Sequence, residues 1–299
     1  MAQVAGYRIV APLGGSGDQL GIAPDGGHVV VRTVSERHAA DPEFREHFRR
    51  ETSAARAVSG PYTANVVGAD ADAPRPWVAA EYCAGVSLSE SVATLGPLGP
   101  GELGTLGTMA AEALRRIHGA GILHYGLKPA TVVITRSGPR ITGFGGCGSG
   151  GSPGFIAPEL LSGEGGSGPA ADVFALGALL ALAATGRNPH GAGGAQQVLY
   201  RTRHSGPDLV GVPDAEWAGF LARCLAKYPA DRPSVPELAQ WCAAHAGDEP
   251  WWDREPLSGM ILGEEEYVAE LAAMDGEFGD GTDGSGWDGI SGAGASTVR

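Results

Sequence analysis

The sequence has few cysteines, and they form no pattern. Its four cysteines are Cys83, Cys147, Cys224 and Cys242, and no two of them make a C-x-x-C pair. A disulfide framework needs paired cysteines at close spacing, and a structural zinc site needs clustered thiols or imidazoles. The spacing excludes both and indicates free thiols in a reducing compartment.

A long apolar run is also missing. The most apolar stretch, VFALGALLALAA at residues 173–184, is too short to span a bilayer. The N-terminal MAQVAGYRIV lacks the charged and then apolar order of a signal peptide. We therefore expect a cytoplasmic protein without a membrane span, in which residues 173–184 form a buried core helix.

The sequence offers no basic region for nucleic acid. Its formal charge is −13, and residues 247–299 hold −11 of this, with 13 Asp and Glu against 2 Arg. The remaining chain is close to neutral, which argues against a nucleic-acid surface. The acidic segment is rich in Gly as well, and we predict that most of it is disordered. Its one periodic piece, GEEEYVAELAAM, places Tyr267, Leu271 and Met274 on one side of a helix.

Two kinds of pattern divide the rest of the chain. Runs of alternating or β-branched residues, YRIVAPL, HVVVRTV and WVAAEYC, crowd the first 85 residues and predict strands. One helical segment, PEFREHFRRETSAARAV, interrupts them. Beyond it the patterns are mostly helical, and GELGTLGTMAAEALRRIHGAG has apolar residues at three- or four-residue spacing. Further helices are predicted near residues 172–185, 215–226 and 235–246.

Several motifs along this pattern occur in the order found in one family. HYGLKPAT begins at His124, FRRETSAARAV contains Glu51, and GSPGFIAPE ends at Glu159. ADVFALG contains Asp172 and ADRPS contains Arg232. Over residues 6–246 these motifs resemble those of bacterial (actinobacterial-type) Ser/Thr protein kinases, which makes a strong fold signal because they are independent.

The resemblance implies an α+β, bilobal protein-kinase-like fold. The expected parts are a small β-rich N-lobe with one helix at residues 1–84, a larger helical C-lobe at 85–246, and the acidic, mostly disordered tail at 247–299. Five residues match family positions that pack or brace this fold. They are His124, Phe144, Glu159, Asp172 and Arg232.

The groups that carry kinase chemistry are replaced. Kinases need an acid that orients the substrate hydroxyl, and an Asn and an Asp that hold Mg²⁺. Those three positions fall on Gly126, Thr131 and Gly143. Residues 113–158 contain no Asp or Glu that could substitute. The resemblance therefore implies that the catalytic acid and the metal ligands are absent.

The phosphate-binding groups also depart from the family pattern. Arg32 stands at the third-strand lysine, and its planar fork does not replace an ammonium. Its charge survives, so we predict an ion pair between Arg32 and Glu51. The Gly-rich loop, LGGSGDQLG, is shortened and places Asp18 where phosphates would lie. For GGCGSGG at residues 145–151 we favour a short mobile loop, and an anion nest is the alternative. We expect Cys147 within this segment to be an inert thiol.

These observations predict a catalytically inactive pseudokinase that acts in signalling as a binding, scaffold or allosteric module, with a protein partner. We expect no metal and no cofactor. Two alternatives stay open, a pseudokinase that binds ATP without Mg²⁺ and a weak atypical Ser/Thr kinase. The residual nucleotide-binding candidates are Arg32, Glu51, Glu81, Cys83 and Lys128, although a loop lysine such as Lys128 is more often solvated.

Overall fold

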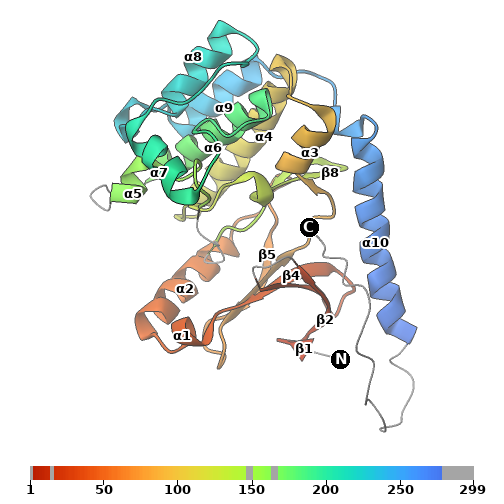
Figure 1. The fold of residues 1–299 in the computed structure, drawn as a ribbon. Coiled ribbons are helices and arrows are strands. Elements are labelled where there is room, and N and C mark those ends of the chain that lie inside the picture. Colours follow the sequence, from red (N-terminus) through yellow and green to blue (C-terminus); the bar gives the residue numbers. More distant parts are fainter. Residues whose placement is uncertain (1–2, 14–16, 146–150, 163–167, 278–299) are drawn as a thin grey trace.

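The chain folds into two lobes with a long helix beside them (Figure 1). This computed structural model describes residues 3–13, 17–145, 151–162 and 168–277. A six-stranded sheet and helix α2 form the small lobe, and helices dominate the large lobe. The α+β, two-lobed architecture expected from the sequence is therefore confirmed.

The small lobe is built on one antiparallel sheet with the strand order β1-β2-β3-β4-β6-β5. The strands are β1 (Gln3–Val4), β2 (Tyr7–Leu13), β3 (Asp18–Ile22), β4 (His28–Thr33), β5 (Val66–Asp70) and β6 (Trp77–Glu81). Branched and aromatic residues favour these strands because they pack well on a pleated surface. The register of β3 and β4 sets Asp18 directly opposite Arg32.

Two helices pack with this sheet, where the sequence predicted one. The short α1 (Glu36–Ala39) precedes α2 (Pro42–Ala55). Helix α2 begins at Pro42 because the Asp41 side chain accepts a hydrogen bond from Glu43 N. Proline suits this first helical position because an N–H group there would have no partner within the helix. Phe48 and Ala55 on its inner face are buried.

The large lobe is organised around α4 and α6. Its elements are β7 (Val86–Ser87), α3 (Leu88–Leu95), α4 (Pro100–Gly119), η1 (Pro129–Thr131), β8 (Val132–Thr135), β9 (Gly138–Ile141), α5 (Pro158–Ser162), α6 (Pro169–Thr185), α7 (Ala195–His204), α8 (Ala215–Cys224), η2 (Pro229–Asp231) and α9 (Val235–Ala244). The periodic apolar residues of α4 are all buried, as predicted. Helix α6 is apolar on every side and buried along its length, which confirms the predicted core helix.

Residues 247–277 are more ordered than the composition indicates. The turn η3 (Trp251–Asp253) is followed by α10 (Leu257–Glu277), where we predicted mostly disorder. Trp251 is fully buried and Trp252 nearly so. The two indole rings bury enough apolar surface to hold the segment on the fold, although its overall Gly and acid content is typical of disorder. The rest of the predicted tail, residues 278–299, lies outside the described residues.

Helix α10 runs along one side of the molecule and touches both lobes, with α3 and β7 near its start and β2 further along (Figure 1). Its inward face consists of Leu257, Ile261 and Val268, all buried. Tyr267, expected on the apolar face, is 40% exposed. Leu257 and Ile261, which precede the GEEEYVAELAAM segment, set the buried face of the helix, so Val268 and not Tyr267 turns inward. In the part of the chain that the structure describes, no helix has the length and apolarity to cross a membrane.

Candidate functional site

A cleft of about 630 Å³ lies between the two lobes. Its small-lobe wall comes from β3, β4 and β6, and its large-lobe wall from η1, β8 and the residues after β9. Arg32 lines one side and Gly143 the other. The volume lies in the range of small-molecule sites.

The loop at His124 is held by a buried carboxylate. The backbone N–H groups of His124 and Tyr125 donate to the two oxygens of Asp172 at 2.8 and 2.9 Å. His118 Nε2 lies 2.8 Å from the same carboxylate. Burial alone would raise the pKa of Asp172, but these hydrogen bonds hold it below its usual range. Asp172 therefore braces the loop, in the role that the family resemblance implies.

His124 packs inside the molecule. It is 3% exposed, its Nε2 lies 3.0 Å from Thr142 O, and its ring centroid lies 6.4 Å from that of Phe144. Burial lowers the pKa of His124, so the ring is neutral near pH 7. The packing roles predicted for His124 and Phe144 agree with these contacts.

The three positions that should carry catalysis face the cleft without suitable groups. Gly126 and Gly143 line it, and neither has a side chain. Gly143 has a φ of +81°. Thr131 also lines the cleft, but its hydroxyl donates to Lys128 O and accepts from Lys128 N, both at 3.0 Å. That hydroxyl is engaged within its own loop.

Arg32 pairs with Asp18 and not with Glu51. Its Nε and Nη2 atoms make a bidentate contact with both Asp18 oxygens. The predicted Arg32–Glu51 pair is therefore wrong. Asp18 and Arg32 are opposite residues of adjacent strands, so their Cβ atoms lie close together. The guanidinium of Arg32 can therefore bind both oxygens of the Asp18 carboxylate. Glu51 lies 3.4 Å from His47 on its own helix and does not line the cleft.

In the segment that joins the lobes, residues 81–85, Glu81 makes hydrogen bonds and an ion pair through its side chain. One backbone N–H group of the segment has no acceptor among the described residues. Glu81 accepts hydrogen bonds from Asn65 and forms an ion pair with Arg140 at 2.6 Å. The N–H groups of Glu81 and Tyr82 donate to Asn65 O and His28 O. The N–H of Cys83 has no acceptor among the described residues. Burial raises the pKa of the Cys83 thiol to about 11, so it stays neutral.

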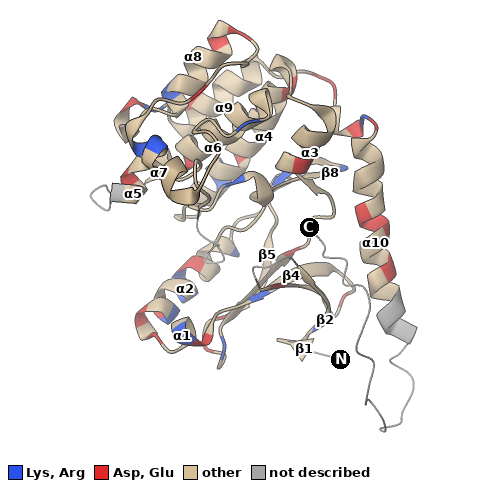
Figure 2. Ribbon diagram, viewed as in Figure 1, with Lys and Arg blue, Asp and Glu red and all other residues tan. Residues whose placement is uncertain are grey.

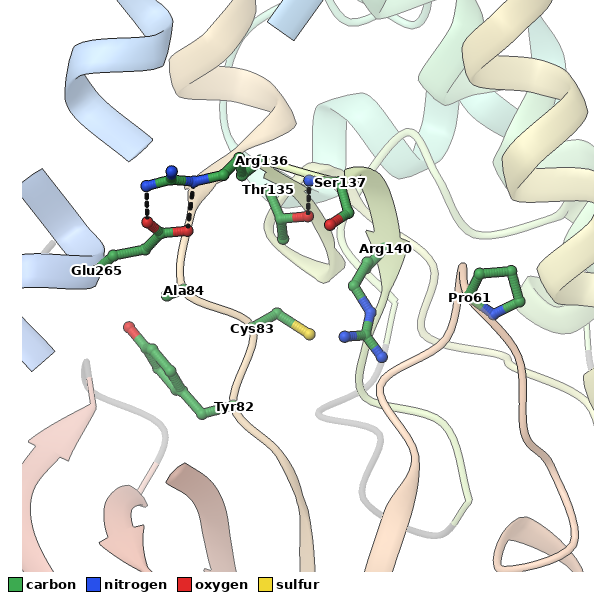
Figure 3. A pocket seen from close by; sticks show the side chains of 9 residues that line it. All are labelled: Pro61, Tyr82, Cys83, Ala84, Thr135, Arg136, Ser137, Arg140 and Glu265. Atoms are coloured by element: carbon green, nitrogen blue, oxygen red, sulfur yellow. Dashed lines mark hydrogen bonds and ion pairs between the residues drawn. The ribbon is translucent and has the colours of Figure 1, made fainter. Parts of the chain in front are cut away.

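A smaller pocket of about 400 Å³ lies on the other side of this segment (Figure 3). Tyr82 and Cys83 form one side of it and Arg140 stands on the other. Arg136 at its rim makes a bidentate ion pair with Glu265 of α10. The next residue toward the N-terminus, Glu264, accepts a hydrogen bond from the Tyr82 hydroxyl and lines the large cleft.

A buried ion pair braces the large lobe. Arg232 Nη1 and Nη2 donate to the two oxygens of Glu159, each at 2.7 Å, and both side chains are buried. The guanidinium also lies 5.0 Å from the ring centroid of Phe174. Arg232 and Glu159 thus join α5 to the loop before α9.

Metal-binding groups do not gather in the described chain. Across residues 3–13, 17–145, 151–162 and 168–277, no three His, Cys, Asp or Glu side chains form a cluster suited to a metal ion. Cys147 and most of the GGCGSGG segment lie outside these ranges, so the nest prediction for residues 145–151 is untested.

Of the predicted candidates, Arg32, Glu81, Cys83 and Lys128 line the cleft and Glu51 does not. Sequence reasoning missed Glu264, which reaches the cleft from α10. The only signal for it was the periodic GEEEYVAELAAM segment. That pattern indicates a helix but not where the helix docks.

Comparisons with known proteins agree with the geometry. The family model described as the protein kinase domain matches residues 15–243. The chain is 36% identical over 286 residues to the serine/threonine-protein kinase AfsK of Streptomyces coelicolor, covering 87% of this chain and 35% of AfsK. It is 37% identical over 275 residues to the probable serine/threonine-protein kinase PkwA of Thermomonospora curvata, covering 87% of this chain and 36% of PkwA.

Solved structures agree as well. The kinase domain of Mycobacterium tuberculosis PknI superposes with a TM-score of 0.67 at 31% identity, covering 82% of this chain and all of that domain. The chain spans about a third of the length of the two curated relatives.

Proposed function

This chain belongs to the protein kinase family, alongside bacterial Ser/Thr kinases, and within it we propose that the chain is a catalytically inactive member that works as a binding module in signalling. One observation carries the proposal. The three cleft positions that would supply the acid and the metal ligands are Gly126, Thr131 and Gly143. Phosphoryl transfer depends on positioning and charge neutralisation by those groups. A cleft that lacks them has no means of anchoring Mg²⁺ in the family's way.

The cleft carboxylate of Asp18 does not fill the gap. Asp18 faces the cleft, but both of its oxygens are held by Arg32. Arg32 in turn is partly neutralised, so it is a poorer phosphate ligand than an unpaired lysine. The pairing of these two residues argues against the weak atypical kinase.

The retained residues are those that hold the fold together. Asp172 braces the loop at His124, and Arg232 pairs with Glu159 in the interior. A fold that keeps its braces while its reactive groups are replaced suits a scaffold or allosteric module that binds a protein partner. Metal-free nucleotide binding is the second candidate function, and the unused Cys83 N–H favours it because hinge recognition needs only backbone groups.

A ligand series with a chemical endpoint tests the proposal. We expect the melting temperature with ATP to be the same with and without Mg²⁺, and Mg²⁺ alone to give no shift. Incubation with γ-labelled ATP and a general acceptor protein should then transfer no label. A shift that depends on Mg²⁺ together with transfer of label would overturn the proposal.

A further inference from the structure

The large cleft has more acidic than basic side chains among its described lining residues. Among the described residues, four carboxylates line it, from Asp18, Glu81, Glu90 and Glu264, against two cations, Arg32 and Lys128. Asp18 is compensated by Arg32, and Glu81 is compensated by Arg140. Of the described residues that line the cleft, this leaves two carboxylates, Glu90 and Glu264, and one further cation, Lys128. The cleft is therefore mildly negative, whereas a nucleotide site must attract phosphates.

The two remaining carboxylates are fixed by the fold. Glu90 lies in the first turn of α3, where its Oε2 accepts from Ser87 N at 3.0 Å and from Ser87 Oγ at 2.7 Å. Both contacts come from a neutral residue, the N-cap Ser87 of a capping box, and no ion pair with Glu90 occurs among the described residues. Glu264 is likewise hydrogen-bonded to a neutral group, the hydroxyl of Tyr82.

Glu264 enters the cleft from outside the matched kinase domain, which ends at residue 243. Neighbouring contacts hold it there. Glu265 pairs with Arg136 of the large lobe, and Ala272 O accepts from Arg8 of the small lobe at 3.4 Å. Helix α10 is thereby tied to the large lobe directly after Glu264 and to the small lobe two turns further on, and Figure 2 shows acidic residues in its middle part. The charge at this edge of the cleft is a built feature of the fold.

The walls of the cleft suit a flat ring. Val30 and Ala80 are register partners on β4 and β6 and line the small-lobe wall of the cleft, and Val133 lines its large-lobe wall. The unused N–H of Cys83 stands at its edge as a hydrogen-bond donor. Apolar walls with a few convergent polar groups are typical of small-molecule sites.

We propose that this cleft binds an uncharged or cationic amine-bearing heterocycle and discriminates against phosphorylated ligands, with Glu264 of α10 as a selecting residue. The inference rests on the proposed function, because a cleft that performs phosphoryl transfer must accept a polyanion. It goes further by naming the class of ligand and a contact residue from outside the kinase domain.

Three probes that share one nucleoside and differ only in the substituent at the 5′ carbon, and through it in charge, test the class of ligand. They are 5′-amino-5′-deoxyadenosine, whose amine is protonated at pH 7, adenosine, which is neutral, and adenosine 5′-monophosphate, which carries about two negative charges. Isothermal titration of the full chain without metal should give affinities in that order. We expect at least about a tenfold ratio between the first and the last. Equal affinities, tightest binding of the monophosphate, or no binding of any probe would overturn the proposal.

A matched pair of variants tests Glu264. Glu264→Gln removes the charge and keeps an oxygen that accepts from Tyr82, so the ratio between the cationic and the anionic probe should fall by about threefold. Glu266→Gln makes the same charge change on the same helix at an exposed residue that does not line the cleft, and it should leave the ratio unchanged. Equal ratios in the two variants would exclude Glu264 as a selecting residue.

The two proposals fail in different ways. Label transfer by the wild-type chain would refute the inactive-kinase function, whatever the order of the three affinities. Absence of transfer together with preferred binding of the monophosphate would refute only the inference about the cleft.

Discussion

Arg232 and Glu159 join distant parts of the large lobe through two hydrogen bonds in its interior. Both side chains are shielded from water, so each charge is stabilised by the opposite charge of its partner. Removing one partner of a buried pair leaves an uncompensated charge, which costs far more than loss of an exposed pair. The different environments of ion pairs in this chain allow a direct comparison.

We expect Glu159→Gln to lower the free energy of unfolding by about 3–5 kcal/mol, because Arg232 stays buried without its counter-charge. Glu46→Gln serves as control, since Glu46 pairs with Arg49 on the surface of α2 and its loss should cost less than about 1 kcal/mol. Urea unfolding followed by circular dichroism measures both. Similar losses in the two variants would contradict the structural role of Glu159.

His190 makes the free energy of unfolding depend on pH. The ring is 3% exposed and stacks on Phe174 at a centroid distance of 5.7 Å. Burial, together with the nearby charges of Lys227 and Arg201, lowers its pKa to about 4. An unfolded histidine titrates near 6.5. The unfolded chain therefore takes up a proton between pH 6.5 and 4 that the folded chain does not, so stability present above pH 6.5 is lost as the pH falls through this window.

His190→Phe should remove this contribution, because phenylalanine keeps a ring against Phe174 and binds no proton. Between pH 7 and pH 4 the wild type should lose up to about 3 kcal/mol more unfolding free energy than the variant. Other titrating groups are the same in both chains and cancel in the difference. Denaturant titrations at the two pH values provide the measurement, and equal losses would show that His190 does not titrate in this range.

Some of these residue contacts follow from sequence and others do not. Arg232–Glu159 and Asp172 were predictable because the surrounding motifs fix both partners in the family fold. Arg32–Glu51 was predicted wrongly for the same reason. The motif gives the family's usual partner, whereas the actual partner, Asp18, is determined by a cross-strand register in β3 and β4 that the sequence does not reveal.

At the scale of elements, α10 is the feature that sets this chain apart from the matched domain. It packs through Leu257, Ile261 and Val268 and reaches both lobes. Composition concealed it, because its acidic residues and the Gly-rich sequence around it are typical of disorder. Helices α4 and α6 were predictable because their apolar residues either repeat at helical spacing or fill a whole buried segment.

Two adjacent residues of α10 test its docked register. Ile261 is 2% exposed and Leu262 is 44% exposed. Ile261→Ala should cost about 2–4 kcal/mol of unfolding free energy, because it leaves a cavity under the helix. Leu262→Ala removes a similar side chain from the outer face and should change stability by no more than about 0.5 kcal/mol. If the two variants melt alike, the helix is not held on the lobes in this register.

At the scale of the whole molecule, the two lobes and their cleft are those of a kinase, whereas the groups that act on phosphate and metal are replaced. Most of this could be predicted from sequence, because the motifs identify both the fold and the substituted positions. The charge balance of the cleft could not be predicted in full, since Glu264 comes from a helix whose docking depends on tertiary contacts.

Restoring chemistry should require several changes together. Gly126→Asp, Thr131→Asn, Gly143→Asp and Arg32→Lys rebuild the acid, both metal ligands and the lysine. Groups that act as a unit are strongly non-additive, so each single variant should transfer no measurable phosphate. The quadruple variant should show weak transfer at best, because Asp18 remains in the cleft. Full activity from one substitution alone would contradict this account, with label incorporation into an acceptor protein as the measurement.

The most direct test of the inactive-kinase account is Mg²⁺- and ATP-dependent phosphoryl transfer by the purified wild-type chain at high enzyme concentration. Ala80→Phe, which places an aromatic ring in the cleft, provides the control that separates activity of this chain from a contaminating kinase. We predict the same background incorporation of label for the wild type and for Ala80→Phe. Incorporation by the wild type that disappears in Ala80→Phe would contradict the account, because it would locate a working phosphoryl-transfer site in this cleft.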